Sequence, residues 1–486
     1  MNPSLVPLDI WRIIFNLLSF MEQIKLRRAC RYFYKNLPIL ELTSHLVINK
    51  LNDSILEQYS AIHSLTLNAG GQQVTKLSHL NKLKQLTLYR CDINEKELNC
   101  LTNLTYLFIS MEKVGSIKKL TNLLTVYLNG EEIIDSRSLL FLTKLTSLIS
   151  YGGFKASHIT NCINLKRLCY NSYSESLTKE VLTNLTNLES LSMIAISKIE
   201  NLNFLPNLEF LELTAKAKAK ATTSISMGIH QCSKLKHLKL EHDIDLTIEA
   251  SNILKLEIID NNSFTNIRKL NTLTSLRLSN KCALKDNHLI GLTNLKVLDL
   301  YGCRNMKNFS FLTSLNSLNS DQVNQETINN LLNLTNLGLL VTINVSSVSH
   351  LTNLRELQVC FCRNLSSIGS EALPYLTKLK LYQNSNITSI ENLTNLKELE
   401  ASYCDDLSPR CLDAFPYLTK LILFRNRNKT SIENLTNLID LCLYSDMHVD
   451  ANSFVKLTRL QYLSLYGHPN SNHLTHLTHI KSFICV

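Results

Sequence analysis

The sequence predicts a solenoid of short parallel strands, an α/β repeat fold, and three observations support this prediction. The tract LTNLTYLFI at Leu101 to Ile109 recurs in variant form from near residue 60 to the C-terminus. Successive copies mostly begin 20 to 22 residues apart, which gives about 21 repeats. Each copy contains an L-x-L step, which has the periodicity of a strand. Because one copy cannot bury its leucines alone, we expect the copies to stack into a continuous core.

The pattern LxxLxxLxL at this period resembles that of leucine-rich repeats. The resemblance implies a horseshoe-shaped solenoid with a parallel inner sheet. We expect this solenoid to occupy residues 41–486, after a small helical module at 1–40. Its outward strand positions would form a long concave face, which is where such proteins bind other molecules.

The cysteines fit the repeat better than they fit a disulfide framework. Cysteine and asparagine alternate at one position of the repeat, at Cys91, Cys303, Cys362 and Cys404 and at Asn261, Asn384 and Asn426. Short polar groups at such a position tie a buried turn to the neighbouring backbone, so we predict buried, unpaired thiols. Free thiols indicate a reducing compartment, and we expect a cytoplasmic or nucleocytoplasmic protein rather than a secreted one. The first residues do not have the features of a signal peptide, and no run of 18 apolar residues predicts a membrane span.

Charge and motif content argue against several other functions. Lysine and arginine exceed aspartate and glutamate by 50 to 40, but they are dispersed, so we predict no nucleic-acid partner. The spacing of His473, His476 and His479 equals the L-x-x-L step of the repeat, so it does not predict a zinc site. We find no Gly-rich phosphate loop, nucleophile motif or placed pair of carboxylates, and we predict neither an enzyme nor a cofactor.

The residues before the repeats have helical periodicity. Apolar side chains at helical spacing predict a first helix, and they are Ile10, Ile13, Ile14, Leu17 and Leu18. Ser19 and Glu22 form an S-x-x-E capping box, which predicts a second helix to about Ala29. A third, short helix is expected from Arg31 to Leu37, before Pro38.

This segment, VPLDIWRIIFNLLSFMEQIKLRRACRYFYKNL from Val6 to Leu37, resembles the F-box motif. It departs from the family pattern in having Val6 for the first leucine, Ala29 for a valine and a slightly short central loop. An F-box followed by leucine-rich repeats resembles the family of F-box receptors of ubiquitin ligases. The resemblance implies a Skp-type adaptor as one partner and an unknown target protein as the other. The adaptor-binding positions it implies are Pro7, Ile10, Ile14, Leu18 and Phe33.

A plainer interpretation of the same helices is that they only cap the open end of the solenoid. The protein would then be a non-catalytic scaffold or inhibitor.

One column of the expected concave face is aromatic. It contains Tyr89, Tyr151, Tyr301, Tyr382, Phe424, Tyr444 and Tyr466. Exposed rings in a row provide a large contact area, and Lys378, Lys380, Lys420 and Arg425 would make the C-terminal end basic. We therefore predict a target-binding surface that consists of Tyr382, Phe424, Tyr444, Tyr466, Lys380 and Arg425. The alternative is that neighbouring rings stack only to stiffen the edge of the sheet.

Overall fold

The structure is a computed structural model that falls into two compact units, Met1–Leu235 and Lys236–Val486. It describes residues 51–68, 74–111, 113–152, 154–172, 177–194, 202–214, 223–225, 229, 232–242, 244–246, 252–262, 264–303, 305–365, 368, 373–384, 386–405, 407–408, 411–425, 431–444, 451–466 and 480–485. Of the first fifty residues it describes 8, 11–12, 15, 20–29, 32–33, 37, 39 and 41–42.

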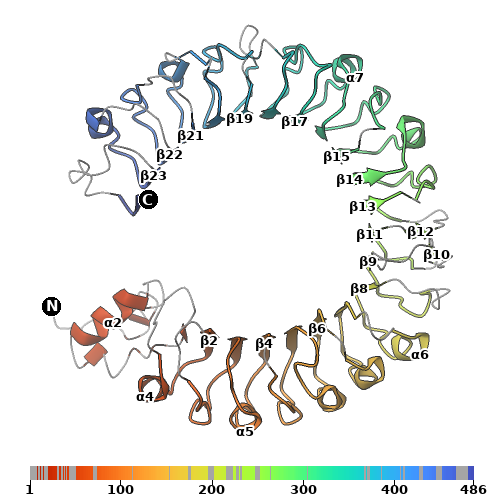
Figure 1. The fold of residues 1–486 in the computed structure, drawn as a ribbon, viewed down its shortest axis with the longest axis vertical. Helices are drawn as coiled ribbons and strands as arrows, with labels where there is room; N and C mark the ends of the chain where they lie inside the picture. Colours follow the sequence, from red (N-terminus) through yellow and green to blue (C-terminus); the bar gives the residue numbers. More distant parts are fainter. Residues whose placement is uncertain are drawn as a thin grey trace. The chain divides into compact units, whose positions relative to one another are not determined.

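The first unit contains a parallel sheet to which each coil contributes one strand (Figure 1). Its strands are β1 (Glu41–Leu42), β2 (Ser64–Asn68), β3 (Gln85–Tyr89), β4 (Tyr106–Ser110), β5 (Thr125–Asn129), β6 (Ser147–Ser150), β7 (Arg167–Tyr170), β8 (Ser190–Ile194) and β9 (Phe210–Thr214), and β10 is Thr223–Ile225. From β2 to β9 each strand pairs in parallel with the strand of the next coil. The lysine-rich tract at 215–221 lies outside the described residues.

The second unit repeats this arrangement. Its strands are β11 (His237–Glu241), β12 (Ile244–Leu246), β13 (Lys255–Asn261), β14 (Ser275–Cys282), β15 (Val297–Tyr301), β16 (Ser317–Ser320), β17 (Asn336–Leu340), β18 (Glu356–Cys360), β19 (Lys378–Tyr382), β20 (Glu398–Ser402), β21 (Lys420–Phe424), β22 (Asp440–Tyr444), β23 (Tyr462–Tyr466) and β24 (Ser482–Cys485). From β13 to β24 each strand pairs in parallel with the next, which confirms the predicted parallel solenoid.

Short helices lie on the side of the coils opposite the strands (Figure 1). They are α4 (Asp53–Leu56), α5 (Glu95–Asn99), α6 (Lys179–Leu182) and α7 (Gln325–Asn330), with 3₁₀ turns η2 (Glu57–Tyr59), η3 (Ser136–Phe141), η4 (Ala156–Ile159), η6 (Asp286–Leu289), η7 (Cys411–Ala414) and η8 (Ala451–Lys456). Asn52, Asn94 and Asn324 cap α4, α5 and α7 by accepting a hydrogen bond from a backbone N–H of the first turn. A coil of about 21 residues leaves room only for such brief helices.

The core follows directly from the L-x-L step. Leu86 and Leu88 of β3 lie in register with Leu107 and Ile109 of β4, and all four are buried. The alternate strand residues point away from this core, because successive strand side chains point to opposite faces. We call the surface formed by these outward residues the sheet face of each unit.

A buried polar ladder ties consecutive coils together, as predicted. Cys91, Cys303, Cys362 and Cys404 are buried, and the sulfur of each is a thiol rather than part of a disulfide. Asn384 occupies the same position and is also buried. Its amide donates to the carbonyls of Val359 and Tyr382 at 2.7 and 3.0 Å, and its oxygen accepts from the N–H of Cys362 at 2.9 Å. A thiol or an amide therefore satisfies backbone groups of the adjoining turns, whereas Asn426 lies outside the described residues.

A second asparagine ladder runs along the exposed part of the coils. The asparagine of the Thr-Asn-Leu triplet donates from its side chain to a backbone carbonyl of the preceding coil, as Asn103 does to Asn81 at 2.7 Å. The same bond recurs in the triplets of Asn122, Asn187, Asn294, Asn353, Asn395 and Asn437, and also at Asn164, Asn207 and Asn333, where another residue replaces the threonine. The recurring triplet thus has a structural cause, which the sequence did not reveal.

Carboxylates bind the backbone of an adjoining coil on the side away from the strands, Glu97 that of the preceding coil and Asp53 that of the following one. The Glu97 carboxylate accepts hydrogen bonds from the N–H groups of Leu77 and Ser78, both at 2.8 Å. Partial burial raises the pKa of Glu97, but the two backbone donors lower it more, so that the net pKa lies below the usual carboxylate range. Asp53 holds Thr75 and Lys76 in the same way, and its pKa is also lowered.

The Glu97→Gln variant is expected to lower the free energy of unfolding by about 1 kcal/mol at neutral pH, because charge-assisted bonds to two N–H groups become neutral ones. A lowered folded-state pKa stabilises the native state above the unfolded-chain value of about 4.3, and this contribution disappears as the pH falls through the folded value. Urea midpoints at neutral pH and at about pH 3.5 measure the difference. An equal loss at both pH values would contradict this role of the carboxylate.

The N-terminal segment forms part of the first unit. Helix α2 (Phe20–Ala29) ends at the residue where the sequence predicted that the second helix would end. Phe15 and Phe33 are buried, and the Phe33 ring contacts the Trp11 ring at a centroid distance of 4.6 Å. Phe33 is one of the five residues assigned to adaptor binding, and this assignment stays a prediction. The other four assigned positions, Pro7, Ile10, Ile14 and Leu18, lie outside the described residues.

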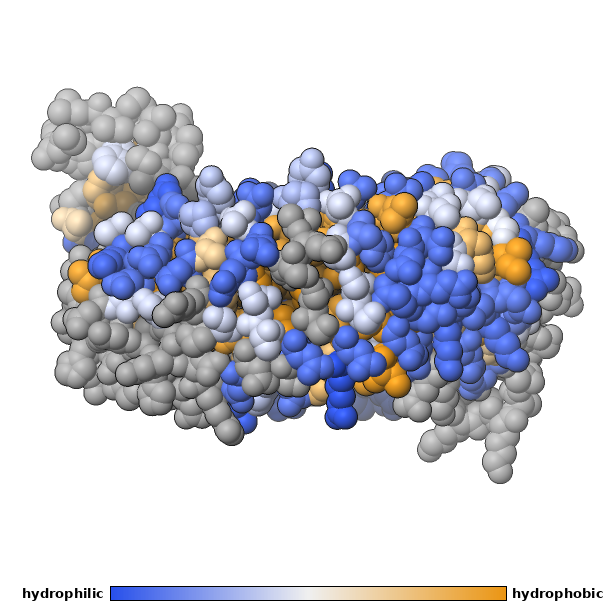
Figure 2. Space-filling model, turned by 90° about the horizontal axis from the view of Figure 1, so that it is seen from above, coloured by the Kyte–Doolittle hydropathy of each residue, from blue (hydrophilic) through white to orange (hydrophobic). Residues whose placement is uncertain are grey.

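The surface drawn in Figure 2 is mostly hydrophilic among the described residues, and its hydrophobic side chains form small, separate patches. Small separate patches are ordinary for a protein surface. Within the described part of the chain, no helix is both long and apolar enough to cross a membrane.

Candidate binding surface

The sheet face of the second unit carries a continuous row of aromatic rings. We call it the ring ladder, and it consists of Phe361, Tyr382, Tyr403, Phe424, Tyr444 and Tyr466. Successive ring centroids are 5.1, 5.5, 5.2, 5.0 and 4.3 Å apart. The first four contacts are tilted or T-shaped, and the last pair is stacked with an interplanar angle of 3°. Such pairs stabilise one another beyond the area they bury, so the ladder is preorganised.

The rings enter the ladder from two different backbone positions. Tyr382, Phe424, Tyr444 and Tyr466 are the last residues of their strands. Phe361 and Tyr403 instead follow the strand, with positive φ angles of 56° and 54°. The left-handed conformation lets their N–H groups donate to the carbonyls of Tyr382 and Phe424 at 2.9 Å, which extends the inter-strand hydrogen bonding by one residue.

Arg425 completes the ladder at its edge. It follows β21 with a φ of 49°, and its guanidinium lies 5.8 Å from the centre of the Tyr403 ring and 5.6 Å from that of Phe424. It also donates to the Tyr403 hydroxyl at 3.3 Å. The guanidinium is exposed, so it remains able to contact a bound partner.

The lysines of the same face do not make it basic, in contrast to our expectation. Lys378 lies 3.6 Å from Glu398, Lys380 lies 2.8 Å from Glu400, and Lys420 lies 2.9 Å from Asp440. Each acidic residue occupies the equivalent position on the next strand, so the charges cancel row by row. Lys380 is thus part of an ion pair that a target would have to disrupt, and its role in target binding stays a prediction.

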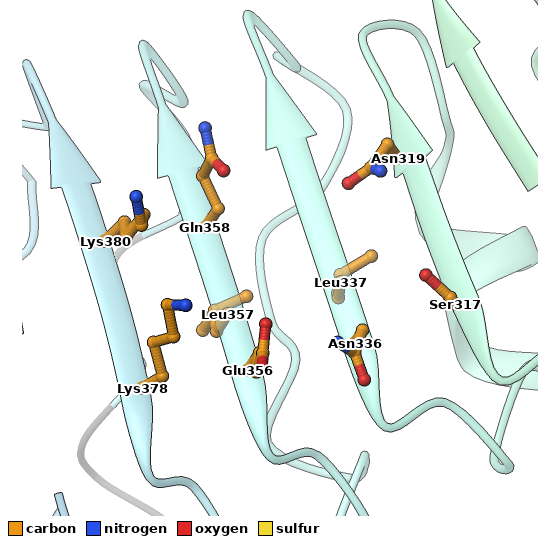
Figure 3. A pocket seen from close by; sticks show the side chains of 9 residues that line it. All are labelled: Ser317, Asn319, Asn336, Leu337, Glu356, Leu357, Gln358, Lys378 and Lys380. Carbon is orange, nitrogen blue, oxygen red and sulfur yellow. The ribbon is translucent and has the colours of Figure 1, made fainter. Parts of the chain in front are cut away.

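Two adjoining hollows lie between these ion pairs and β14. Small side chains on β16 and β17 form them, and they have volumes of about 320 and 550 Å³. Figure 3 shows the smaller one, which is lined from four neighbouring strands. Gly338 lines the larger hollow, and a Cβ at that position would require the Asn319 side chain to move. The smaller hollow is lined mainly by polar groups, which suit polar groups of a partner, whereas Ile259, Leu340 and Tyr301 make the lining of the larger hollow more apolar.

No group of three or more His, Cys, Asp or Glu side chains in the described residues could hold a metal ion. The three histidines at 473, 476 and 479 lie outside the described part of the chain.

Comparison with known proteins adds the fold but not a family. No protein-family model and no curated protein matches the sequence. The structure is similar to that of TLR13 in its complex with ssRNA13, with a TM-score of 0.57 and 16% identity over 93% of this chain and 85% of that chain. It is also similar to mouse RP105 in the RP105/MD-1 complex, with a TM-score of 0.57 and 17% identity over 89% and 90% of the two chains. The chain has the leucine-rich-repeat fold. At these identities the similarity shows the fold alone.

The leucine-rich-repeat register places the residues that the sequence assigned to target binding, whose role in binding stays a prediction. Tyr382, Phe424, Tyr444 and Tyr466 do lie in one row, together with Arg425. Tyr382 is exposed, whereas the other three rings are half-buried by their neighbours. The sequence analysis missed the two rings in left-handed turn positions, because it counted only strand positions. Both rings directly follow a strand of the repeat, so the register of the repeat could have identified them from the sequence.

Proposed function

We propose that this leucine-rich-repeat protein is a non-catalytic receptor that binds a target protein on the sheet face of its second unit. The ring ladder is the observation that carries the proposal. Aromatic side chains with few rotatable bonds dominate the energetics of protein interfaces, and these rings are held in place before any partner arrives. Arg425 adds a guanidinium, another group that is enriched among binding hot spots.

The charges on this face favour a protein rather than a nucleic acid as the binding partner. One structurally similar protein is in a complex with ssRNA13 and another is in a complex with MD-1, so the fold itself does not indicate whether the partner is a nucleic acid or a protein. Binding to a phosphate backbone depends on lysines and arginines that release counterions. On the described sheet face, Lys378, Lys380 and Lys420 are each neutralised by a carboxylate. Alternating charge pairs instead give register and specificity to a protein interface.

We further propose that the receptor belongs to a Skp-cullin-F-box type ubiquitin ligase. Support comes from the resemblance of Val6 to Leu37 to the F-box motif and from the end of α2 at Ala29. The N-terminal helices would bind the Skp-type adaptor, and other subunits would perform the ligation. Such a complex acts in the cytoplasm or nucleus, and buried cysteines that remain thiols are consistent with a reducing compartment.

Full-length protein is expected to co-precipitate with a purified Skp-type adaptor, and the double variant Pro7→Ala, Ile10→Ala is expected to bind it at least about 30-fold more weakly. The loss corresponds to about 2 to 4 kcal/mol for two apolar contacts. Titration of the adaptor against both proteins measures this change. Unaltered urea unfolding of the variant would show that the repeats remain folded. Wild-type protein that does not bind the adaptor would exclude the ligase role.

The second candidate is a plain scaffold or inhibitor whose N-terminal helices cap the solenoid. The burial of Phe15 and Phe33 favours it, because these rings help to cover an apolar end. Failure of adaptor binding, together with retained target binding, would establish this alternative.

A further inference from the structure

The sheet face of the first unit differs from that of the second in charge. From β2 to β6 its outward side chains are in register and form three rows. They are Ser64, Gln85, Tyr106, Thr125 and Ser147 in the first row, Thr66, Thr87, Phe108, Tyr127 and Ile149 in the second, and Asn68, Tyr89, Ser110 and Asn129 in the third, with Tyr151 beyond β6. We call this surface the uncharged face, because none of these described positions carries a charged side chain.

We propose that the uncharged face is a second recognition surface, which binds an uncharged polypeptide segment of a partner protein. It is separate from the target surface proposed above and does not depend on it. Tyrosine, serine and asparagine are the residues that dominate the binding loops of antibodies, where rigid rings supply contact area and short polar groups adapt their hydrogen bonds. The same residue types, with threonine and glutamine, make up most of the uncharged face.

Charge determines what kind of segment would fit. A charged group of a partner buried against this face would find no opposite charge among its outward residues, and burying an unpaired charge is strongly unfavourable. Burial raises the pKa of Tyr106, and burial together with Cys169 and Tyr127 raises that of Tyr151 to about 12, so these phenols stay neutral. Cations lie at the margins of the face: the Arg90 guanidinium contacts the Met111 sulfur at 3.4 Å, and Arg167 of β7 is the register partner of Ser147.

The packing of the two central rings, Phe108 and Tyr127, disfavours ligands that stack on the face of either ring. Phe108 and Tyr127 stack at 4.6 Å with an interplanar angle of 22°, so each covers one face of the other. Tyr89 lies against Phe108 at 4.8 Å and Tyr151 against Tyr127 at 5.7 Å. The central rings therefore have neighbours on both sides, which leaves their edges and hydroxyls for contact. Sugars and nucleobases bind aromatic rings through the ring face, whereas peptide groups can bond to phenol hydroxyls and amides.

A display experiment with full-length protein tests the proposal. A phage library of random linear peptides is selected on the wild type, and polyuridylate and the neutral glucan laminarin are titrated as the competing ligand classes. We expect peptides poor in Asp, Glu, Lys and Arg, with affinity that changes less than about twofold between 0.05 and 0.5 M salt. Neither the RNA nor the glucan is expected to bind to this face.

Two variants localise the binding. The double variant Tyr89→Ser, Tyr127→Ser removes two rings and is expected to lower the affinity for the selected peptides at least about 100-fold. Thr87→Lys keeps the rings but adds a charge to the middle of the face, and it is expected to lower the affinity for the peptides about tenfold or more. Ser464→Lys, the matched control on β23 of the second unit, is expected to bind as the wild type does. The proposal is overturned if no peptide is enriched, if Thr87→Lys binds as the control does, or if RNA or glucan binding is lost in Thr87→Lys.

Discussion

The triple variant Tyr382→Ala, Tyr403→Ala, Phe424→Ala is expected to lose capture of the target protein. These rings are consecutive members of the ring ladder, with centroid distances of 5.5 and 5.2 Å. Hot-spot side chains contribute about 2 kcal/mol each when truncated, so the combined loss is expected to exceed about 1,000-fold in affinity. Proximity labelling in cells, with the variant compared to the wild type, measures the loss of partners.

A matched control distinguishes the loss of the ring ladder from the loss of any exposed aromatic side chains. Tyr375 and Tyr417 are 56% and 58% exposed but lie outside the strands. Their double alanine variant is expected to recover the same partners as the wild type. Adaptor binding should survive in both variants, because the N-terminal helices belong to the first unit. Recovery of the wild-type partners by the triple variant would show that the ring ladder only stiffens the sheet.

The Asn384→Ala variant is expected to lower the free energy of unfolding by about 3 to 5 kcal/mol. The change removes the amide that now bonds to the N–H of Cys362 and to the carbonyl of Val359, while the Tyr382 carbonyl keeps the Phe361 N–H as a donor. An unsatisfied buried polar group costs about 1 to 3 kcal/mol. Urea unfolding followed by circular dichroism measures the change.

Asn384→Cys is the informative companion, because neighbouring coils carry Cys362 and Cys404 at the same position. The Cys404 thiol donates to the carbonyl of Ser402 at 3.3 Å, so a thiol at 384 is expected to recover most of the stability. The exposed Asn395 serves as the control, and its alanine variant should cost less than about 1 kcal/mol. A cysteine variant as unstable as the alanine variant would contradict the interchange of the two residue types.

The repeat fold could be predicted from the sequence because its determinants are local. Leu86 and Leu88 specify a strand with one buried side, and the next coil repeats the pattern at a fixed distance, so the register of the stack follows. The Cys and Asn ladder was predictable for the same reason.

The binding surface could be predicted only in part, because it depends on relations between coils. The ion pair of Lys380 with Glu400 joins residues 20 positions apart, and a list of lysines does not show it. Tyr403 joins the rings through its left-handed φ, which strand counting does not include. The burial of Phe33 against Trp11 likewise depends on how the helices pack.

The coil pairs near the C-terminus have a consequence for how the receptor can evolve. Asn395 donates to the carbonyl of Pro374 at 2.8 Å, and 42 residues later Asn437 makes the same bond to Pro416 at the same distance. Recombination between these segments would add or remove two coils while restoring each hydrogen bond at the junction. The row of rings, with Tyr382 and Phe424 in equivalent places, would lengthen or shorten in step. The reach of the receptor can therefore change in a single genetic event, without any new packing between coils.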